Sequence, residues 1–176
     1  MSAVRRTGVR MMLALWLAAA GVGASAAEPL EASVKAAYLA KFAFYVDWPP
    51  AAFAGPTAPI VLCIVGDDAF GALVEEATAG QAVQGRAIAV KRLKAISRES
   101  GCHIAYVGAE ARLEAVKGSP VLLVTDALGG NGMINFVLRD NRVRFTVDDD
   151  LAAQFGLGIS SKLLNVALAV KPRGKG

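Results

Sequence analysis

Residues 129–170 contain the clearest local pattern in the chain, two neighbouring segments whose apolar side chains recur at every second position. This period of two runs through residues 133–138 and 142–147, and it is typical of β-strands. Asp140 and Asn141 lie between the segments, and both residue types tolerate the left-handed backbone of a tight turn. The pattern therefore predicts an antiparallel hairpin, around which the rest of the chain has to be arranged.

Two helices are predicted after the hairpin. Three aspartates at residues 148–150 provide an N-cap and first-turn negative charge for the first helix, which Gly156 can close. Ser160 or Ser161 caps the second helix, which extends through Val170. The second helix is apolar on nearly every side, so it has to be covered by the sheet, by another helix or by a partner protein.

An amphipathic helix is predicted at residues 31–46, well before the hairpin. Val34, Tyr38 and Phe42 recur at every fourth position and give it an apolar, aromatic face. The helix ends before Trp48, because two prolines follow and proline disfavours helix in the residue before it. The aromatic face can dock a partner or pack on a sheet, and packing is favoured because amphipathic stripes usually face a core.

Four short β-branched runs lie between this helix and the hairpin, and their lack of alternation is typical of strands buried on both faces. They occupy residues 60–65, 87–90, 104–107 and 121–124. Helical segments are predicted between them at residues 69–79 and 109–116. This order predicts a single-domain α/β sandwich with a mainly parallel sheet and helices on both faces. The antiparallel hairpin near the C-terminus would form one edge of the sheet.

Residues 1–26 have the form of a secretory signal peptide. Arginines precede an apolar run at residues 11–22, and Ala-Ser-Ala at residues 24–26 gives a small-x-small cleavage site. The run is about 12 residues long where a membrane-spanning helix needs about 20. We therefore expect cleavage before Ala27, export to the periplasm and no stable membrane insertion of the mature chain. The arginine pair at residues 5–6 leaves the twin-arginine route open beside the general one.

Cleavage leaves 176 − 26 = 150 residues and lowers the formal net charge from +4 to +1, because the removed segment carries three arginines and no acid. Phosphate contacts need a dense basic surface, so nucleic acid is not expected as a partner. A chain of this length is ordinarily one domain. We place that domain at residues 27–171, followed by a short basic tail at residues 172–176 that is expected to be disordered.

The motifs of common enzyme and metal sites are missing from the sequence. No nucleotide-binding glycine motif follows a predicted strand, and no metalloprotease or hydrolase signature occurs. His103 directly follows Cys102, and adjacent residues on a strand point to opposite faces, so the two form a poor catalytic pair. One histidine and two cysteines also fall short of a four-ligand zinc site. We expect no enzyme activity, no cofactor and no metal.

Cys63 and Cys102 are the two cysteines of a chain that the leader directs to an oxidising compartment. Such a pair predicts a disulfide. It would close a loop of 102 − 63 = 39 residues and stabilise the fold by about 3 to 4 kcal/mol on the chain-entropy model. The spacing is not that of a redox-active Cys-x-x-Cys motif, so the bond is expected to be structural.

Several segments resemble landmarks of the YfiR family of periplasmic proteins. GMINF, the hairpin ending in RFTV, and GLGISSKLLNVALAV are similar to the closing motif of that family. The remaining landmarks, in the same order as in the family, are VKAAYLAKFAFYVDWP, LCIVGDDAFG, CHI and VLLVTD. The chain departs from the family pattern at Val147-Asp148, where Ile-Asn is commoner, and it lacks the second cysteine pair of some members.

The resemblance implies a regulatory protein that represses an inner-membrane diguanylate cyclase by binding its periplasmic sensor domain. Cyclic di-GMP signalling and biofilm formation would fall as a result. We expect the partner to contact apolar anchor residues surrounded by a small polar rim. The anchors are Leu157, Ile159 and Leu163, and the rim residues are Ser160 and Lys162. A homodimer is left open.

A second hypothesis is a periplasmic small-molecule binding protein. VGDDAF, VGAEAR and VTDALG each place an acidic residue in the turn after a predicted strand. These turns would gather at the carboxyl edge of the sheet, where open α/β folds bind ligands. Acids in such turns are also common as helix caps, so the pattern alone does not decide between the two hypotheses.

Overall fold

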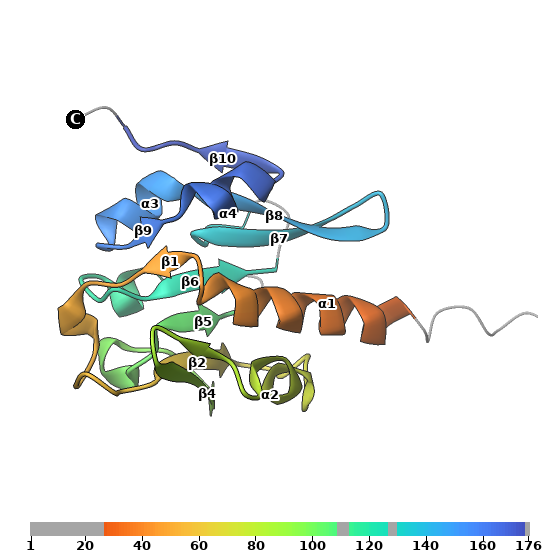
Figure 1. Cartoon of the computed structure of the whole chain (residues 1–176). Coiled ribbons are helices and arrows are strands. Elements are labelled where there is room, and N and C mark those ends of the chain that lie inside the picture. Colours follow the sequence, from red (N-terminus) through yellow and green to blue (C-terminus); the bar gives the residue numbers. More distant parts are fainter. Residues whose placement is uncertain (1–26, 109–112, 127–129, 175–176) are drawn as a thin grey trace, which may run out of the picture.

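The computed structural model describes residues 27–108, 113–126 and 130–174 (Figure 1). The predicted signal peptide lies outside the described residues. The main sheet has eight strands in the order β10-β8-β7-β6-β5-β2-β4-β3. Its strands are β2 (Ile60–Val65), β3 (Ala82–Val83), β4 (Arg86–Leu93), β5 (Ile104–Tyr106), β6 (Leu122–Thr125), β7 (Ile134–Arg139), β8 (Arg142–Asp148) and β10 (Ala169–Lys171).

The centre of the sheet is parallel. β2 pairs in parallel with β4 and β5, and the parallel pairing continues from β5 through β6 to β7. β7 and β8 form the predicted antiparallel hairpin, in which Phe136 lies opposite Phe145. Asp140 and Asn141 make the turn with φ angles of 50° and 56°. The predicted α/β class, mainly parallel sheet and hairpin are therefore confirmed.

The helices include α1 (Ala27–Phe42), α2 (Leu73–Thr78), α3 (Asp149–Gln154) and α4 (Ser161–Val166). α1 and α2 lie in contact over one face of the sheet, and α1 runs along the direction of the middle strands (Figure 1). Tyr38 and Phe42 of α1 pack against Phe136 and Phe145, with ring centroids 5.3 to 6.1 Å apart. The aromatic face of the first helix therefore packs on the sheet, as expected.

The opposite face of the sheet buries a smaller cluster around the disulfide. Cys63 and Cys102 are bonded, with their Cα atoms 5.8 Å apart, which confirms the predicted pair. Val116 packs beside them from the 3₁₀-helix η3 (Leu113–Val116), and Leu123 adds a buried side chain from β6. Only this end of the helix predicted at residues 109–116 lies within the described residues.

Two predicted helix ends are wrong, each because a strand pairing replaces the helix. The first helix ends at Phe42, not Val46, since Val46 enters β1 (Val46–Asp47) and pairs with β9 (Gly158–Ile159). The last helix ends at Val166, since Ala167 is extended and β10 then pairs in parallel with β8. β10 therefore forms the edge of the sheet that was expected of the hairpin.

Two smaller predictions also need correction. The helix predicted at residues 69–79 is shorter and spans Leu73–Thr78, because Asp68 accepts the N–H groups of Phe70 and Gly71 in a turn before it. The basic tail was expected to be disordered, but Arg173 forms an ion pair with Asp149 at 2.9 Å and also donates to the carbonyl of Leu157.

Candidate functional site

The short antiparallel pair β1–β9 joins two distant parts of the chain. Val46 lies opposite Ile159 and Asp47 opposite Gly158. The N–H of Ser160 then donates to the carbonyl of Tyr45 at 2.9 Å. The ladder pairs the middle of YVDW with Gly158 and Ile159 of GLGIS, so two of the family-like sequence landmarks form one structural unit. We call this unit the clasp.

The local sequence determines where the two helices on either side of β9, α3 and α4, begin or end. Asp148 caps α3 by accepting the N–H of Leu151 at 2.8 Å, as predicted. Gly156 adopts a φ of 74° and closes the helix, because this left-handed conformation suits glycine. Ser160, rather than Ser161, caps α4, and its Oγ accepts the N–H of Lys162 at 3.3 Å.

The structure brings the five predicted partner-binding residues together around the clasp but divides them between inside and outside. Leu157, Ile159 and Leu163 are buried in the main core and retain 2, 8 and 4% of their accessible surface. Ser160 is half-buried and Lys162 is exposed. The three residues expected as apolar anchors for a partner are therefore part of the hydrophobic core beneath the clasp.

Other apolar side chains of the same region face solvent. Val166 of α4 is 59% exposed, and Leu168, which follows it, is 38% exposed. Phe44, two residues before β1, is 39% exposed, and the Lys41 ammonium lies 5.5 Å from the centre of its ring. The sequence pattern does not indicate these residues, because its periodicity places Val166 and Leu168 in a long helix with no defined outer face.

The GMINF segment has a structural role next to the sheet. Asn135 accepts the N–H of Gly132 and the hydroxyl of Thr125, and its amide donates to the Gly132 carbonyl at 3.0 Å. A Cβ on Gly132 would lie 2.9 Å from the Ile134 carbonyl oxygen and 3.0 Å from that of Leu123. Only glycine fits this turn without displacing the backbone, so the motif fixes the approach to β7.

A polar cluster lies at the carboxyl edge of the sheet, where the second hypothesis places a ligand. The buried Lys35 ammonium contacts Glu31 and Asp126, the latter at 2.5 Å, and the Tyr106 hydroxyl donates to Asp126 at 2.9 Å. Burial alone would lower the pKa of Lys35, but the two carboxylates raise it above its usual value. These residues and Phe70 line a cavity of about 370 Å³.

His103 is a structural residue, as expected from the sequence. Its Nδ1 accepts the N–H of Val61 at 3.0 Å, and its Nε2 donates to the carbonyl of Ala52 at 3.1 Å. Its ring stacks on Phe53 at 4.5 Å, and Arg86 lies on that phenyl ring at 3.9 Å. Burial lowers the pKa of His103, so the neutral ring holds the loop before β2 against β5.

Within the described ranges, no three His, Cys, Asp or Glu side chains form a group that could hold a metal ion. The helices in this part of the chain are all too short or too polar to cross a membrane.

Comparison with known proteins identifies one related family. The family model described as YfiR/HmsC-like matches residues 32–168, which include most of α1, the main sheet strands up to β8, and both sides of the clasp. No curated protein matches the chain. The matched range covers more than three quarters of the sequence.

Proposed function

Because the chain belongs to the YfiR/HmsC-like family, we propose that it is a periplasmic regulator that binds and represses an inner-membrane diguanylate cyclase. Binding to the periplasmic sensor domain of the cyclase would hold its cytoplasmic catalytic domain inactive. The family match over residues 32–168 is the observation that carries this proposal. Lower cyclic di-GMP and weaker biofilm formation are the expected outputs.

The proposed contact is the surface of the clasp. It comprises the exposed or half-buried side chains Phe44, Ser160, Lys162, Val166 and Leu168, which we call the clasp surface. Apolar side chains ringed by polar ones are typical of the core and rim of a protein interface. Leu157, Ile159 and Leu163 contribute indirectly, since their burial fixes the backbone that presents this surface.

Substitution of the most exposed apolar residue tests the proposed contact. Val166→Asp should leave the fold intact, because the side chain is 59% exposed. It would place a charge against the partner and lower affinity at least tenfold. The measurements are cellular cyclic di-GMP and recovery of the cyclase when the tagged protein is pulled down from envelope extract.

Leu138→Asp is the matched control, because Leu138 is equally exposed at 56% but lies on the outer end of the hairpin. It should repress as well as the unmodified protein. A folded Val166→Asp variant that still represses fully would exclude Val166 from the contact. Deletion of the whole gene without any change in cyclic di-GMP would contradict the regulatory function itself.

The carboxyl-edge cluster supports a second candidate function, binding of a small molecule. Lys35, Asp126 and Tyr106 present charged and phenolic groups at a cavity of about 370 Å³, within the size range of ligand sites. A thermal-shift screen of small polar metabolites tests this candidate. A true ligand should raise the melting temperature of the protein but not of a Lys35→Gln, Tyr106→Phe variant.

A further inference from the structure

One edge of the sheet ends in a strand that is only partly covered. β4 pairs with β2 along residues 88–93 on its inner side. On its outer side β3 pairs only with Arg86 and Ala87, and β3 is the last strand in the order. Six consecutive residues, about 20 Å of strand, therefore have no paired strand on the outer side among the described residues.

The direction of the free backbone groups follows from one hydrogen bond. The N–H of Gly66, which follows β2, donates to the carbonyl of Leu93 at 2.8 Å, so the backbone groups of Leu93 point inward. Backbone groups alternate between the two sides along a strand. Those of Ala89, Lys91 and Leu93 therefore point toward β2, while the N–H and C=O groups of Ile88, Val90 and Arg92 point outward.

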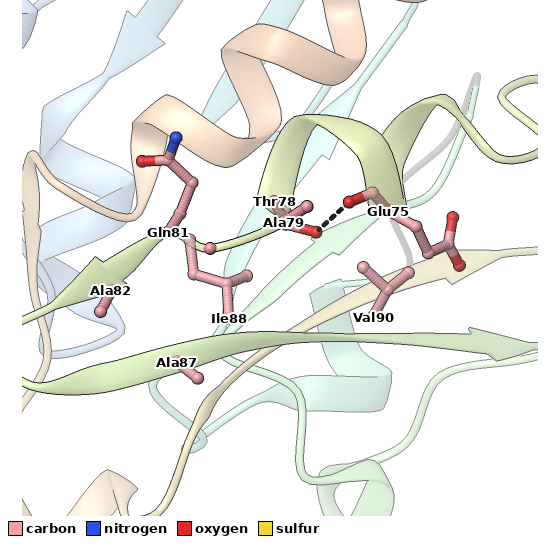
Figure 2. Close-up of a pocket in the computed structure, with 9 residues that line it drawn as sticks. Glu75, Thr78, Ala79, Gln81, Ala82, Ala87, Ile88 and Val90 are labelled. Carbon is pink, nitrogen blue, oxygen red and sulfur yellow. Dashed lines mark hydrogen bonds between the residues drawn. The ribbon is translucent and has the colours of Figure 1, made fainter.

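A cavity of about 450 Å³ lies beside this edge (Figure 2). Ile88 and Val90 point from β4 toward α2, where Thr78 and Ala79 form the opposite wall. Ala82 of β3 closes one end of the cavity. Glu75, Thr78 and Gln81 also line the cavity, beside its apolar residues. Side chains of an added strand that face α2 would enter this space, as alternate side chains do in other strand-addition sites.

The charged residues of β4 do not shield this edge in the usual way. Proteins often protect edge strands with charged side chains. Here the Arg92 guanidinium is held by its own chain, through Asp68 at 2.7 Å and through Glu75. The Lys91 ammonium donates to the carbonyl of Ser100 at 3.0 Å on the other face of the sheet. Both cations are thus turned away from the outer backbone groups.

A second copy of the chain does not fit the edge. Antiparallel pairing of two β4 strands about Val90 would place Leu93 beside the partner's Ala87, a position that Ala82 already occupies. Pairing about Lys91 would place two lysines directly opposite each other. Pairing about Arg92 would place two Arg92–Asp68–Glu75 clusters opposite each other, each with a net negative charge. Like charges directly opposite destabilise a strand pair. An extended segment of a different protein can end beside Ile88, before it reaches β3, and need not carry a like charge opposite Lys91 or Arg92. It therefore avoids all three conflicts.

We propose that residues 88–93 form a strand-addition site for an extended segment of another protein. Its outward N–H and C=O groups bond to those of Ile88, Val90 and Arg92. Side chains facing α2 are small and apolar and fill the cavity, and an acidic side chain lies beside Lys91. The site is at the opposite edge of the sheet from β10 and does not depend on which enzyme the protein regulates.

Hydrogen exchange tests the proposal with a pattern specific to strand addition. Short peptides selected from a random display library on the purified protein serve as the probe. Peptide binding should slow amide exchange at Ile88, Val90 and Arg92 at least tenfold. Exchange at Ala89, Lys91 and Leu93 should change little, because their amides already face β2. Enriched sequences should alternate small apolar residues with acidic or polar ones.

Proline at residue 90 provides the matched substitution. Val90→Pro removes an outward N–H that the fold does not use, and proline is tolerated at such edge positions. It should weaken peptide binding at least tenfold, whereas Val90→Ala, which retains the N–H, should keep most of the affinity. Equal binding by both variants would overturn the proposal. So would the absence of any enriched peptide, or protection of the edge that rises with protein concentration alone.

Discussion

Ile159 lies directly opposite Val46 in the clasp, although 159 − 46 = 113 positions separate them in the sequence. Both side chains are buried, at 8 and 5% exposure, and both belong to the main hydrophobic core. The pair ties the end of α1 to the start of α4. Stability and the shape of the clasp surface therefore depend on the same contact.

Ile159→Asp should unfold the protein rather than only weaken partner binding. An unpaired carboxylate in this core position should lower the free energy of unfolding by roughly 3 kcal/mol or more. Circular dichroism and urea denaturation measure the loss. Val166→Asp places the same charge on the exposed side of α4 and should melt near the unmodified protein. A folded Ile159→Asp variant of normal stability would show that Ile159 does not contribute to the core.

Removal of the disulfide should cost about 3 to 4 kcal/mol of unfolding free energy, because the bond closes a loop of 39 residues. The double variant Cys63→Ala, Cys102→Ala measured by urea denaturation checks this value. A reducing agent should destabilise the unmodified protein to the same extent and leave the double variant unchanged. Equal stability of all three samples would show that the loop is already constrained without the bond.

Stability should fall as the pH drops from about 7.5 to 5.5 because of His103. Burial lowers the pKa of this ring in the folded protein, and the positive charge of Arg86 acts in the same direction. The unfolded chain, with a histidine pKa of about 6.5, then binds the proton first. Full stability is present above that value and is lost as the pH falls through it.

Urea midpoints at several pH values measure this dependence. His103→Gln removes the titrating group, so its midpoint should be lower at pH 7.5 but nearly constant down to pH 5.5. A variant with the same slope as the unmodified protein would assign the pH dependence to other groups.

Gly132→Ala should destabilise the protein by roughly 1 to 3 kcal/mol. The added methyl group would meet the backbone carbonyls of Ile134 and Leu123, which cannot move without disturbing β6 and β7. Gly55→Ala is the control, since no atom lies within 4 Å of its Cβ position and its φ angle suits any residue. Thermal melting of the two variants should differ clearly, and equal melting temperatures would refute the close fit.

Elements defined by local sequence were predicted well. β2 begins and ends where its apolar run does, and the Asp140-Asn141 turn forms because both residues accept positive φ angles. Asp148 and Ser160 cap the N-termini of α3 and α4, and Gly156 ends α3. These roles depend only on residues that are close in the sequence. Local chemistry was sufficient in each case.

Elements defined by distant pairing were missed. Neither β1 nor β9 has more than two residues, and each is extended only because the other lies beside it. The apolar run ending in Val170 fits a helix or a strand equally well, and pairing with β8 decides for the strand. Burial of Leu157 and Leu163 could not be predicted for a similar reason. Periodicity does not describe the long-range packing that buries them, so both were expected at the partner-binding surface.

The clasp also limits the order in which the protein can fold. Closing a contact across 113 residues is slow compared with forming the hairpin or α3, because loop-closure entropy opposes it. A chain delivered through a membrane channel from its N-terminus would have to leave β1 unpaired until residue 159 had emerged, whereas the aromatic face of α1 could pack on Phe136 and Phe145 earlier. Completion of the core would then coincide with the release of the last segment, so any chaperone that acts on this protein should recognise the unpaired β1 segment.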